Sequence, residues 1–284
     1  MMDVTFWGVR GSIPSPGPGT VRYGGNTACV SVRLPSGELI ILDCGTGARN
    51  LGISLLAGPF GKGQGSATLL LSHAHWDHIQ GFPFFGPFYV PGNSFTVYGG
   101  SRGERVLEDV LERQMAAQFF PVQSFRNMGA RIEMRALGED KDVLVGSATI
   151  RAHGKPHVAT PALAFRIQAG GKALAYASDA GYGSDGPPQA AVELCRGVDL
   201  LIHDSTFTPE DRALRLERGL SSLEDAVDCA TRARVKRLAL FHYDQDYSDH
   251  DVDELVARGR RRLEEHASKG IEVIGAAEGL TVSL

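Results

Sequence analysis

The chain has 284 residues, of which 43% are hydrophobic and 22% charged, so it has ample apolar material for a core. Its net charge of −4 at pH 7 gives no sign of the strongly basic face with which proteins usually bind duplex nucleic acid, and leaves room for a local basic rim. The sequence also lacks a signal peptide, an apolar run of the ~20 residues that span a bilayer, and a C-x-x-C pair among its four cysteines. We therefore expect a single cytoplasmic domain over residues 1–284, with reduced thiols and no membrane partner.

The first half of the chain predicts strands joined by glycine-rich connections. Residues 28–34 and 39–42 form an antiparallel hairpin in this prediction, because the intervening Pro-Ser-Gly-Glu is a typical turn. The spacing of apolar residues over 102–117 predicts a helix. The expected strands of this half are 4–7, 28–34, 39–42 and 67–72.

The second half predicts further strands, with helices between the later ones. Ser221 and Glu224 have the spacing of a capping box, so a helix is expected to start there and run to about Arg234. Residues 249–267 begin acidic and end basic, as the helix dipole favours. The expected strands are 148–152, 162–168, 172–177, 198–202 and 237–241, with 271–274 and 280–284 closing a sheet. This order predicts an α/β protein, an αββα sandwich of two mixed β-sheets with outer helices.

The run His73-Ala74-His75-Trp76-Asp77-His78 is the most informative motif of the chain. It follows the apolar strand 67–72, and open α/β sheets bind their ligands in loops that leave a strand. His73 and His75 are two residues apart and can turn toward the same ion. Asp77 and His78 project differently and can serve a second ion. The motif therefore predicts a site for two metal ions.

Two ions need more ligands than one loop offers, and three further donors lie beside apolar runs. His157 precedes the strand at 162, Asp179 follows the strand 172–177, and His242 follows the strand 237–241. Imidazole and carboxylate ligands together favour zinc, with manganese and iron as alternatives. The predicted assignment places His73, His75 and His157 on one divalent ion, Asp77, His78 and His242 on the other, and Asp179 between them.

Each of these donors has a competing interpretation. His153 competes with His157, which we favour because it lies nearer the strand that follows. Asp179 might only cap a turn, and His242 might be a core histidine. Asp43 is expected to orient a ligand histidine through its second ring nitrogen rather than to bind metal.

Together these residues resemble the metallo-β-lactamase fold superfamily over essentially the full chain. Residues 8–12, 22–27 and 203–207 resemble its phosphodiesterase branch, which includes tRNase Z and bacterial cyclic-nucleotide phosphodiesterases. The resemblance implies a hydrolase with two divalent ions and a metal-bridging hydroxide. In this interpretation Asp77 binds metal and orients the hydroxide, and either water or His203 protonates the leaving oxygen. Asp204, which replaces the Glu of tRNase Z, is a catalytic candidate with His203, although such buried pairs often only brace a loop.

The sequence departs from the pattern of this branch at two places, and both departures restrict the class of substrate that we expect. The interval between His157 and Asp179 is too short for the tRNA-gripping arm of tRNase Z, so precursor tRNA is not expected as a partner. Leu220 stands where the branch usually has a histidine that assists at the phosphate. We therefore expect a small cyclic-nucleotide-type phosphodiester as substrate, and the resemblance implies a homodimer. The alternatives are a carbonyl hydrolase, either a lactonase or a thioesterase, and a catalytically weak metal-bound nucleotide sensor.

Overall fold

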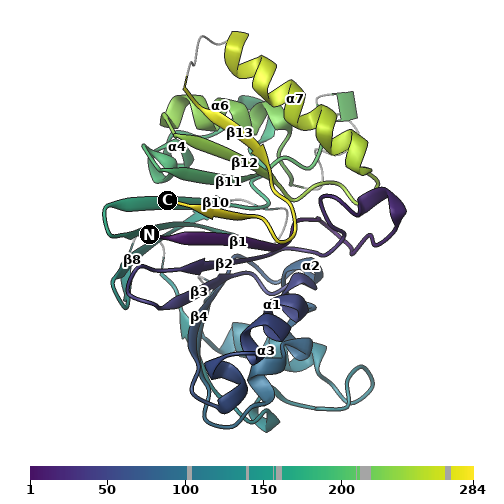
Figure 1. Cartoon of the computed structure of the whole chain (residues 1–284), viewed down its shortest axis with the longest axis vertical. Coiled ribbons are helices and arrows are strands. Elements are labelled where there is room, and N and C mark those ends of the chain that lie inside the picture. The colour runs from purple at the N-terminus through teal and green to yellow at the C-terminus, as the bar shows by residue number, and fades with distance from the viewer. Residues whose placement is uncertain are drawn as a thin grey trace.

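A computed structural model of the chain describes residues 1–100, 104–138, 141–155, 157, 162–208, 210–211, 219–265 and 270–284. Two seven-stranded sheets lie against each other, with helices on their outer faces (Figure 1). This arrangement confirms the predicted α/β class and its two mixed sheets. Within the described residues, no helix combines the length and the apolarity needed to cross a membrane.

The first sheet has the strand order β14-β1-β2-β3-β4-β5-β6. The predicted hairpin is confirmed, since β2 and β3 pair antiparallel, whereas β3, β4, β5 and β6 run parallel. Parallel strands end at the same edge of a sheet, so the segments after β3 and β4 lie side by side. The strands are β1 (Asp3–Gly8), β2 (Cys29–Arg33), β3 (Leu39–Leu42), β4 (Ser66–Leu71), β5 (Ser94–Gly99), β6 (Arg131–Ala136) and β14 (Thr281–Ser283).

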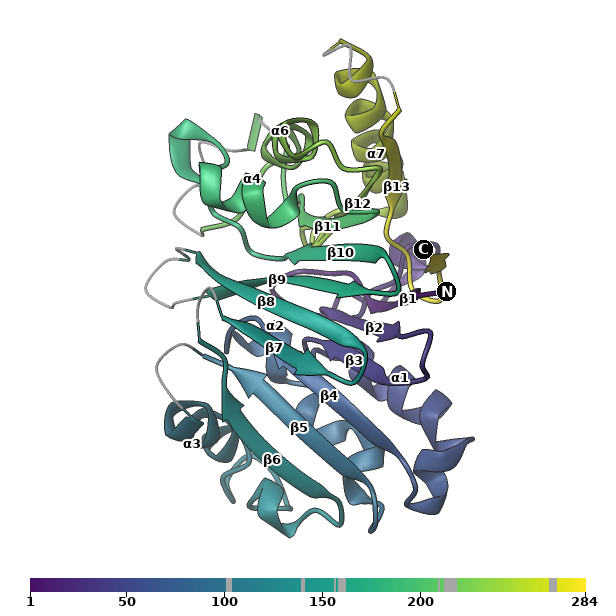
Figure 2. The same cartoon turned by 90° about the vertical axis from the view of Figure 1, so that its left-hand side faces the viewer.

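The second sheet has the order β13-β12-β11-β10-β9-β8-β7 (Figure 2). Strands β10 to β13 are parallel, and β8 runs in the same direction because both β8 and β10 pair antiparallel with β9. The chain therefore leaves β8, β10, β11 and β12 at one edge. The strands are β7 (Asp142–Val145), β8 (Ala148–Lys155), β9 (Ala162–Ala169), β10 (Lys172–Ala177), β11 (Leu200–Asp204), β12 (Arg237–Phe241) and β13 (Glu272–Gly275).

Helices cover the outer face of each sheet. In Figures 1 and 2, α1 and α3 lie beside the first sheet, and α4, α6 and α7 beside the second. The α-helices are α1 (Gly47–Leu56), α2 (Trp76–Ile79), α3 (Glu104–Gln114), α4 (Gln189–Cys195), α6 (Leu223–Ala233) and α7 (Asp249–Glu265). The short 3-10 helices are η1 (Pro18–Thr20), η2 (Pro59–Lys62), η3 (Phe82–Phe84), η4 (Gly86–Tyr89), η5 (Phe125–Asn127) and η6 (Gly183–Asp185).

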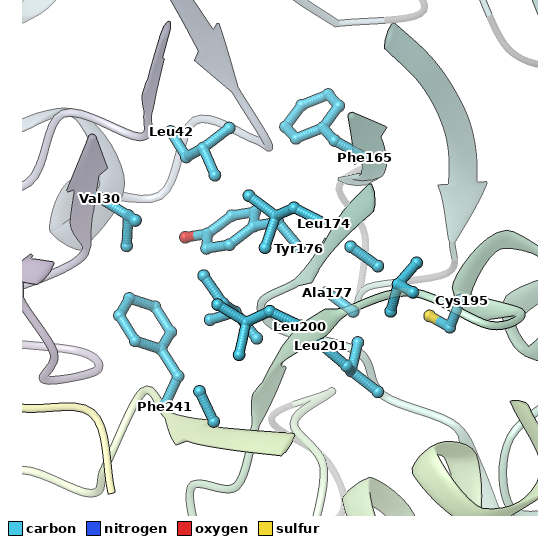
Figure 3. Packing of buried hydrophobic residues seen from close by; sticks show 14 of the residues in the cluster. Val30, Leu42, Phe165, Leu174, Tyr176, Ala177, Cys195, Leu200, Leu201 and Phe241 are labelled. Carbon is cyan, nitrogen blue, oxygen red and sulfur yellow. The ribbon is translucent and has the colours of Figure 1, made fainter. Parts of the chain in front are cut away.

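The larger apolar core fills the space between the two sheets and continues under the helices of the second sheet. Figure 3 shows Leu42 of the first sheet near Phe165 and Tyr176 of the second. Tyr176 is fully buried, and its hydroxyl donates a hydrogen bond to Asp43 Oδ2 at 2.7 Å. This hydrogen bond therefore connects the two sheets at the border of the core, beside the loops that follow the strands.

Several sequence predictions need correction. The strand expected at 198–202 extends to Asp204, and β13 and β14 do not close one sheet, because β14 pairs with β1 of the first sheet. The capping box is shifted by one residue, to Ser222 and Asp225. Residues 102–103 of the first expected helix and 266–267 of the last lie outside the described residues.

The capping box of α6 gives a stability prediction. The Ser222 side chain accepts a hydrogen bond from the backbone N–H of Asp225, and the Asp225 carboxylate accepts one from the backbone N–H of Ser222. Ser222→Ala should lower the free energy of unfolding by about 1 kcal/mol and the melting temperature by ~2–4 °C, measured by calorimetry. Ser184→Ala, at an exposed position of η6, is the control. Equal melting temperatures for the two variants would contradict the prediction.

Candidate metal centre

The four polar residues of the His73–His78 motif lie directly beyond the carboxyl end of β4. His73 and His75 occupy the extended segment after the strand, and Asp77 and His78 lie on the short helix α2. The prediction of a loop is thus right for the first pair only. The backbone changes from extended to helical at His75 (φ −66°, ψ 151°), so the two pairs lie on different local structures.

The three remaining predicted ligands come from the second sheet. His157 follows β8, Asp179 follows β10 and His242 directly follows β12. Asp179 and His242 have φ values of 52° and 59°, in the left-handed region that non-glycine residues rarely adopt. Such backbone conformations are held by the surrounding structure and are concentrated at functional sites.

The first group of potential ligands is made of His73, His75, His157 and Asp179, whose ligand atoms all lie within 4.8 Å of one another. His157 Nε2 is 3.0 Å from His75 Nδ1. Asp179 Oδ2 lies 3.7 Å from His73 Nε2 and 3.5 Å from His157 Nε2. The structure therefore brings together the predicted first ligand set, which takes in His157 and not His153.

The second group contains Asp77, His78 and His242. The Nε2 atoms of His78 and His242 are 3.3 Å apart, and Asp77 Oδ2 is 3.1 Å from His242 Nε2. Asp179 Oδ1 lies 3.1 Å from His78 Nε2 and 3.2 Å from His242 Nε2. One oxygen of Asp179 thus faces each group, which is the position predicted for a carboxylate between two ions.

The donors of the first group fit a divalent cation. The Nε2 atom of His73 is buried and has no hydrogen-bond partner among the described residues, although buried polar atoms are normally paired. Burial lowers the pKa of His157 to about 4 and that of His73 well below its ordinary value, so both imidazoles are neutral at pH 7. Neutral imidazole is the form that binds metal, and its combination with carboxylates suits zinc.

The outer ring nitrogens of three histidines are held by further groups. His78 Nδ1 donates to Asp43 Oδ2 at 2.8 Å, which is the role expected of Asp43. His157 Nδ1 donates to the carbonyl of Gly219 at 2.8 Å, and His242 Nδ1 lies 3.0 Å from Thr206 Oγ1. Such hydrogen bonds fix the ring orientation and leave Nε2 free for an ion.

His203 is not brought to this cluster. It is fully buried, its Nδ1 donates to the backbone carbonyl of Asp204 at 2.7 Å, and its Nε2 lies 2.9 Å from the Tyr182 hydroxyl. Asp204 accepts hydrogen bonds from Thr206 and from the backbone N–H of Ser221. Asp204 thus braces the segments that carry Thr206 and Leu220, and His203 lies where it cannot protonate a group at the cluster.

Two groups at the site had no predicted role. The backbone N–H of Ser12 donates to Asp77 Oδ2 at 2.7 Å, so the N-terminal loop reaches the cluster. The buried ammonium of Lys155 donates to the carbonyls of Ser178 and Asp179. The N-terminal loop could have been recognised from sequence, because residues 8–12 resemble the phosphodiesterase branch. Nothing in the sequence distinguished Lys155 from a surface lysine.

The two ligand groups predict a metal stoichiometry. The purified chain should bind two divalent ions, and His242→Ala should retain one, because it removes a donor from the second group only. Elemental analysis after equilibration with zinc measures the ratio. His250→Ala, which alters an exposed histidine of α7, should still bind two. One ion per chain in both the parent and His242→Ala would rule out two separate ligand groups.

Comparison with known proteins gives concordant matches. Residues 39–243 match the family model described as a beta-lactamase superfamily domain. Ribonuclease Z of Synechococcus sp. (strain WH7803) is 27% identical, and the match covers 87% of this chain and 86% of the relative. Yeast PDE1 superposes with a TM-score of 0.73 at 12% identity, covering 100% and 99% of the two chains. The short form of human tRNase Z superposes with a TM-score of 0.67 at 21% identity, covering 99% and 98%.

Proposed function

Because this chain belongs to the beta-lactamase superfamily and is a hydrolase of the metallo-β-lactamase fold, we propose that it is a dinuclear metal-dependent phosphodiesterase. Residues 1–284 would form one domain, since the proposed ligands come from both sheets. The observation that carries the proposal is the position of Asp179, with one carboxylate oxygen facing each ligand group.

Seven residues would hold the ions: His73, His75 and His157 one, Asp77, His78 and His242 the other, and Asp179 both. Two divalent ions, when bound, lower the pKa of water toward ~7 and neutralise charge on the phosphate oxygens. We assign Asp77 a second role in orienting the attacking water, because Ser12 holds its Oδ2 atom. Asp43, Gly219 and Thr206 keep three ligand imidazoles in one orientation.

The substrate we propose is a small cyclic-nucleotide-type diester. The name ribonuclease denotes an enzyme that cleaves the phosphodiester links of RNA, which supports this bond type for the chain. Strands β9 and β10 form a hairpin joined at Gly170 and Gly171. This hairpin takes up most of the described residues between His157 and Asp179. That leaves no room for an RNA-gripping arm, so precursor tRNA is not the substrate we favour.

The second candidate is a carbonyl hydrolase acting on a lactone or thioester. Leu220 favours it, because this residue adjoins Gly219, whose carbonyl holds His157. Its side chain is 7% exposed, yet it belongs to neither of the two apolar core clusters. An apolar side chain in that position suits an acyl group better than a charged phosphate.

Turnover on matched substrates distinguishes these candidates. The zinc-loaded chain is assayed on bis-p-nitrophenyl phosphate, a cyclic mononucleotide, an acyl lactone and an acyl thioester. Cleavage of the two phosphodiesters alone is the expected result, and loss of that activity in His75→Ala ties it to the first ligand group. Cleavage of only the lactone or thioester would replace the phosphodiesterase proposal by the carbonyl one. Nucleotide binding without turnover would favour a sensor.

Leu220→His gives a prediction specific to the phosphodiesterase. An imidazole at position 220 can protonate the leaving oxygen, and general acid assistance is typically worth ~10²–10⁴ in rate. We expect faster cleavage of a diester with a poor leaving group, and little change with p-nitrophenolate, which departs without protonation. Leu220→Met, of similar size and without a proton to give, is the matched control.

The rates of these variants are compared on folded protein of equal metal content, because position 220 is buried. If Leu220→His cleaves the poor-leaving-group diester no faster than Leu220→Met does, position 220 does not face the phosphate.

A further inference from the structure

A buried lysine lies beside the metal centre, at the end of β8. Lys155 is the last residue of this strand and is only 7% exposed, although lysine is almost never buried without a partner. Its Nζ atom donates hydrogen bonds to two successive carbonyls, those of Ser178 and Asp179, and the second of these bonds measures 2.5 Å. The side chain of Lys155 therefore ends at the turn that follows β10.

The register of the second sheet explains why a long side chain is needed at this position. Ala152 of β8 and Tyr176 of β10 both pair with Phe165 of β9. Lys155 and Asp179 follow these two residues by three positions each, so they lie at the same level along the sheet. Strands β8 and β10 are two strand spacings apart, which is about 10 Å. The four-carbon stem of lysine carries its donor across β9 toward the turn.

The turn that Lys155 binds has an unusual backbone conformation. Asp179 has a φ value of 52°, in the left-handed region that residues with a side chain rarely adopt. Such a conformation persists where the surrounding groups hold it. The carbonyl of Ser178 belongs to the peptide plane before Asp179, and the carbonyl of Asp179 belongs to the plane after it. Two hydrogen bonds from one nitrogen therefore restrain both backbone angles of Asp179 together.

The side chain of Asp179 is held separately. Ser178 Oγ donates a hydrogen bond to Asp179 Oδ1 at 2.7 Å. This oxygen also lies 3.1 Å from His78 Nε2 of the second ligand group, whereas Oδ2 lies 3.7 Å from His73 Nε2 of the first. Because Lys155 contacts the backbone on both sides of Asp179, its hydrogen bonds leave the two carboxylate oxygens to face the two ligand groups.

The lysine itself lies on the helix side of the second sheet. Together with Ala177 and Cys195, it lines a cavity of about 40 Å³ beneath α4. Lys155 belongs to neither of the two groups of ligand atoms found among the described residues. Its contacts therefore suit a residue that positions a ligand, and not one that touches substrate.

We propose that Lys155 is a positioning residue, which fixes the backbone of Asp179 so that one carboxylate oxygen faces each ligand group. Without these two donors the turn can relax and move the carboxylate away from both groups at once. Groups that hold metal ligands in place are typically worth 10–100-fold in metal affinity. The inference rests on the proposed function, since it treats both ligand groups as ion sites.

The test is zinc binding by the full chain and by Lys155→Met. Methionine keeps an unbranched, flexible side chain and removes the donors. Competition with a chromophoric chelator measures the affinity for both ions in the absence of any substrate. We expect both affinities to fall by ~10–100-fold in the variant. The visible spectrum of the cobalt-loaded chain, which depends on the geometry of the ligands, should change as well.

Two control variants separate positioning from a general loss of stability. Lys172→Met makes the same change at a lysine of β10 whose side chain is 43% exposed, and Ser222→Ala weakens the capping box of α6. Both should bind zinc with the affinity of the parent and give its cobalt spectrum. If Lys155→Met does not fold, Lys155→Gln, which has a shorter side chain with a neutral donor, takes its place in the same two measurements.

The outcomes distinguish the role of Lys155 from that of the whole site. A folded variant at position 155 with the zinc affinities and cobalt spectrum of the parent would overturn the proposal, even if it melted at a lower temperature. Weaker binding of only one ion would also overturn it, because Asp179 faces both groups. A parent chain that binds two ions and cleaves no phosphodiester would instead reject the proposed function and leave the role of Lys155 unaffected.

Discussion

Replacing Asp179 by asparagine is expected to reduce phosphodiester turnover by more than ~100-fold, the upper end of what is lost when a group that merely supports a ligand is removed. The substitution keeps the shape of the side chain and removes its charge. Because its two oxygens face the two ligand groups at 3.1–3.7 Å, the metal content of both groups should fall together. Turnover and metal content are measured on the same samples.

The matched control is Asp185→Asn, which changes the same residue type in the exposed turn η6 downstream of Asp179. It should retain two ions and the turnover of the parent. If Asp179→Asn also retained both ions and most of its turnover, Asp179 would be only a turn residue at the end of β10.

Removing the metal is expected to lower the melting temperature by on the order of 10 °C or more. An ion that binds only the folded chain at 1,000 times its dissociation constant stabilises it by about 4.1 kcal/mol. For chains of roughly this size, each kcal/mol corresponds to ~2–4 °C. Seven donors from both sheets should make this linkage strong. Calorimetry before and after treatment with a chelator, and again after zinc is restored, measures the shift.

The two histidine variants provide the comparison. His250→Ala should show the full shift, whereas His78→Ala, which removes a donor of the second group, should show a smaller one. Identical melting curves with and without chelator would mean that the described cluster holds no ion tightly.

The residues that we propose as ligands could be selected from sequence because each of them adjoins an apolar strand that was itself recognisable. The strands at the edges of the sheets were harder to predict from sequence. In β6 and β7 the exposed and half-buried positions dominate, and polar residues such as Arg131 and Asp142 hide the alternation. Helix α1 begins at Gly47, where a side chain would collide with the backbone of Trp7. The close approach to Trp7 therefore requires glycine at position 47, although glycine normally argues against a helix.

His203 illustrates a prediction that depended on a strand boundary. The predicted strand ends at 202, so the sequence gives no indication of the faces toward which His203 and Asp204 point. Strand β11 continues to Asp204, and adjacent residues of a strand point to opposite faces. His203 consequently contacts Tyr182, and Asp204 contacts Thr206 and Ser221.

The order of the donors along the chain has a consequence for biosynthesis. A ribosome releases the last donor of the first group, Asp179, well before His242, which completes the second. During translation the residues proposed for the first ion are therefore all made before the last residue proposed for the second. An ion held by the second proposed group could therefore bind only after β12 has been synthesised.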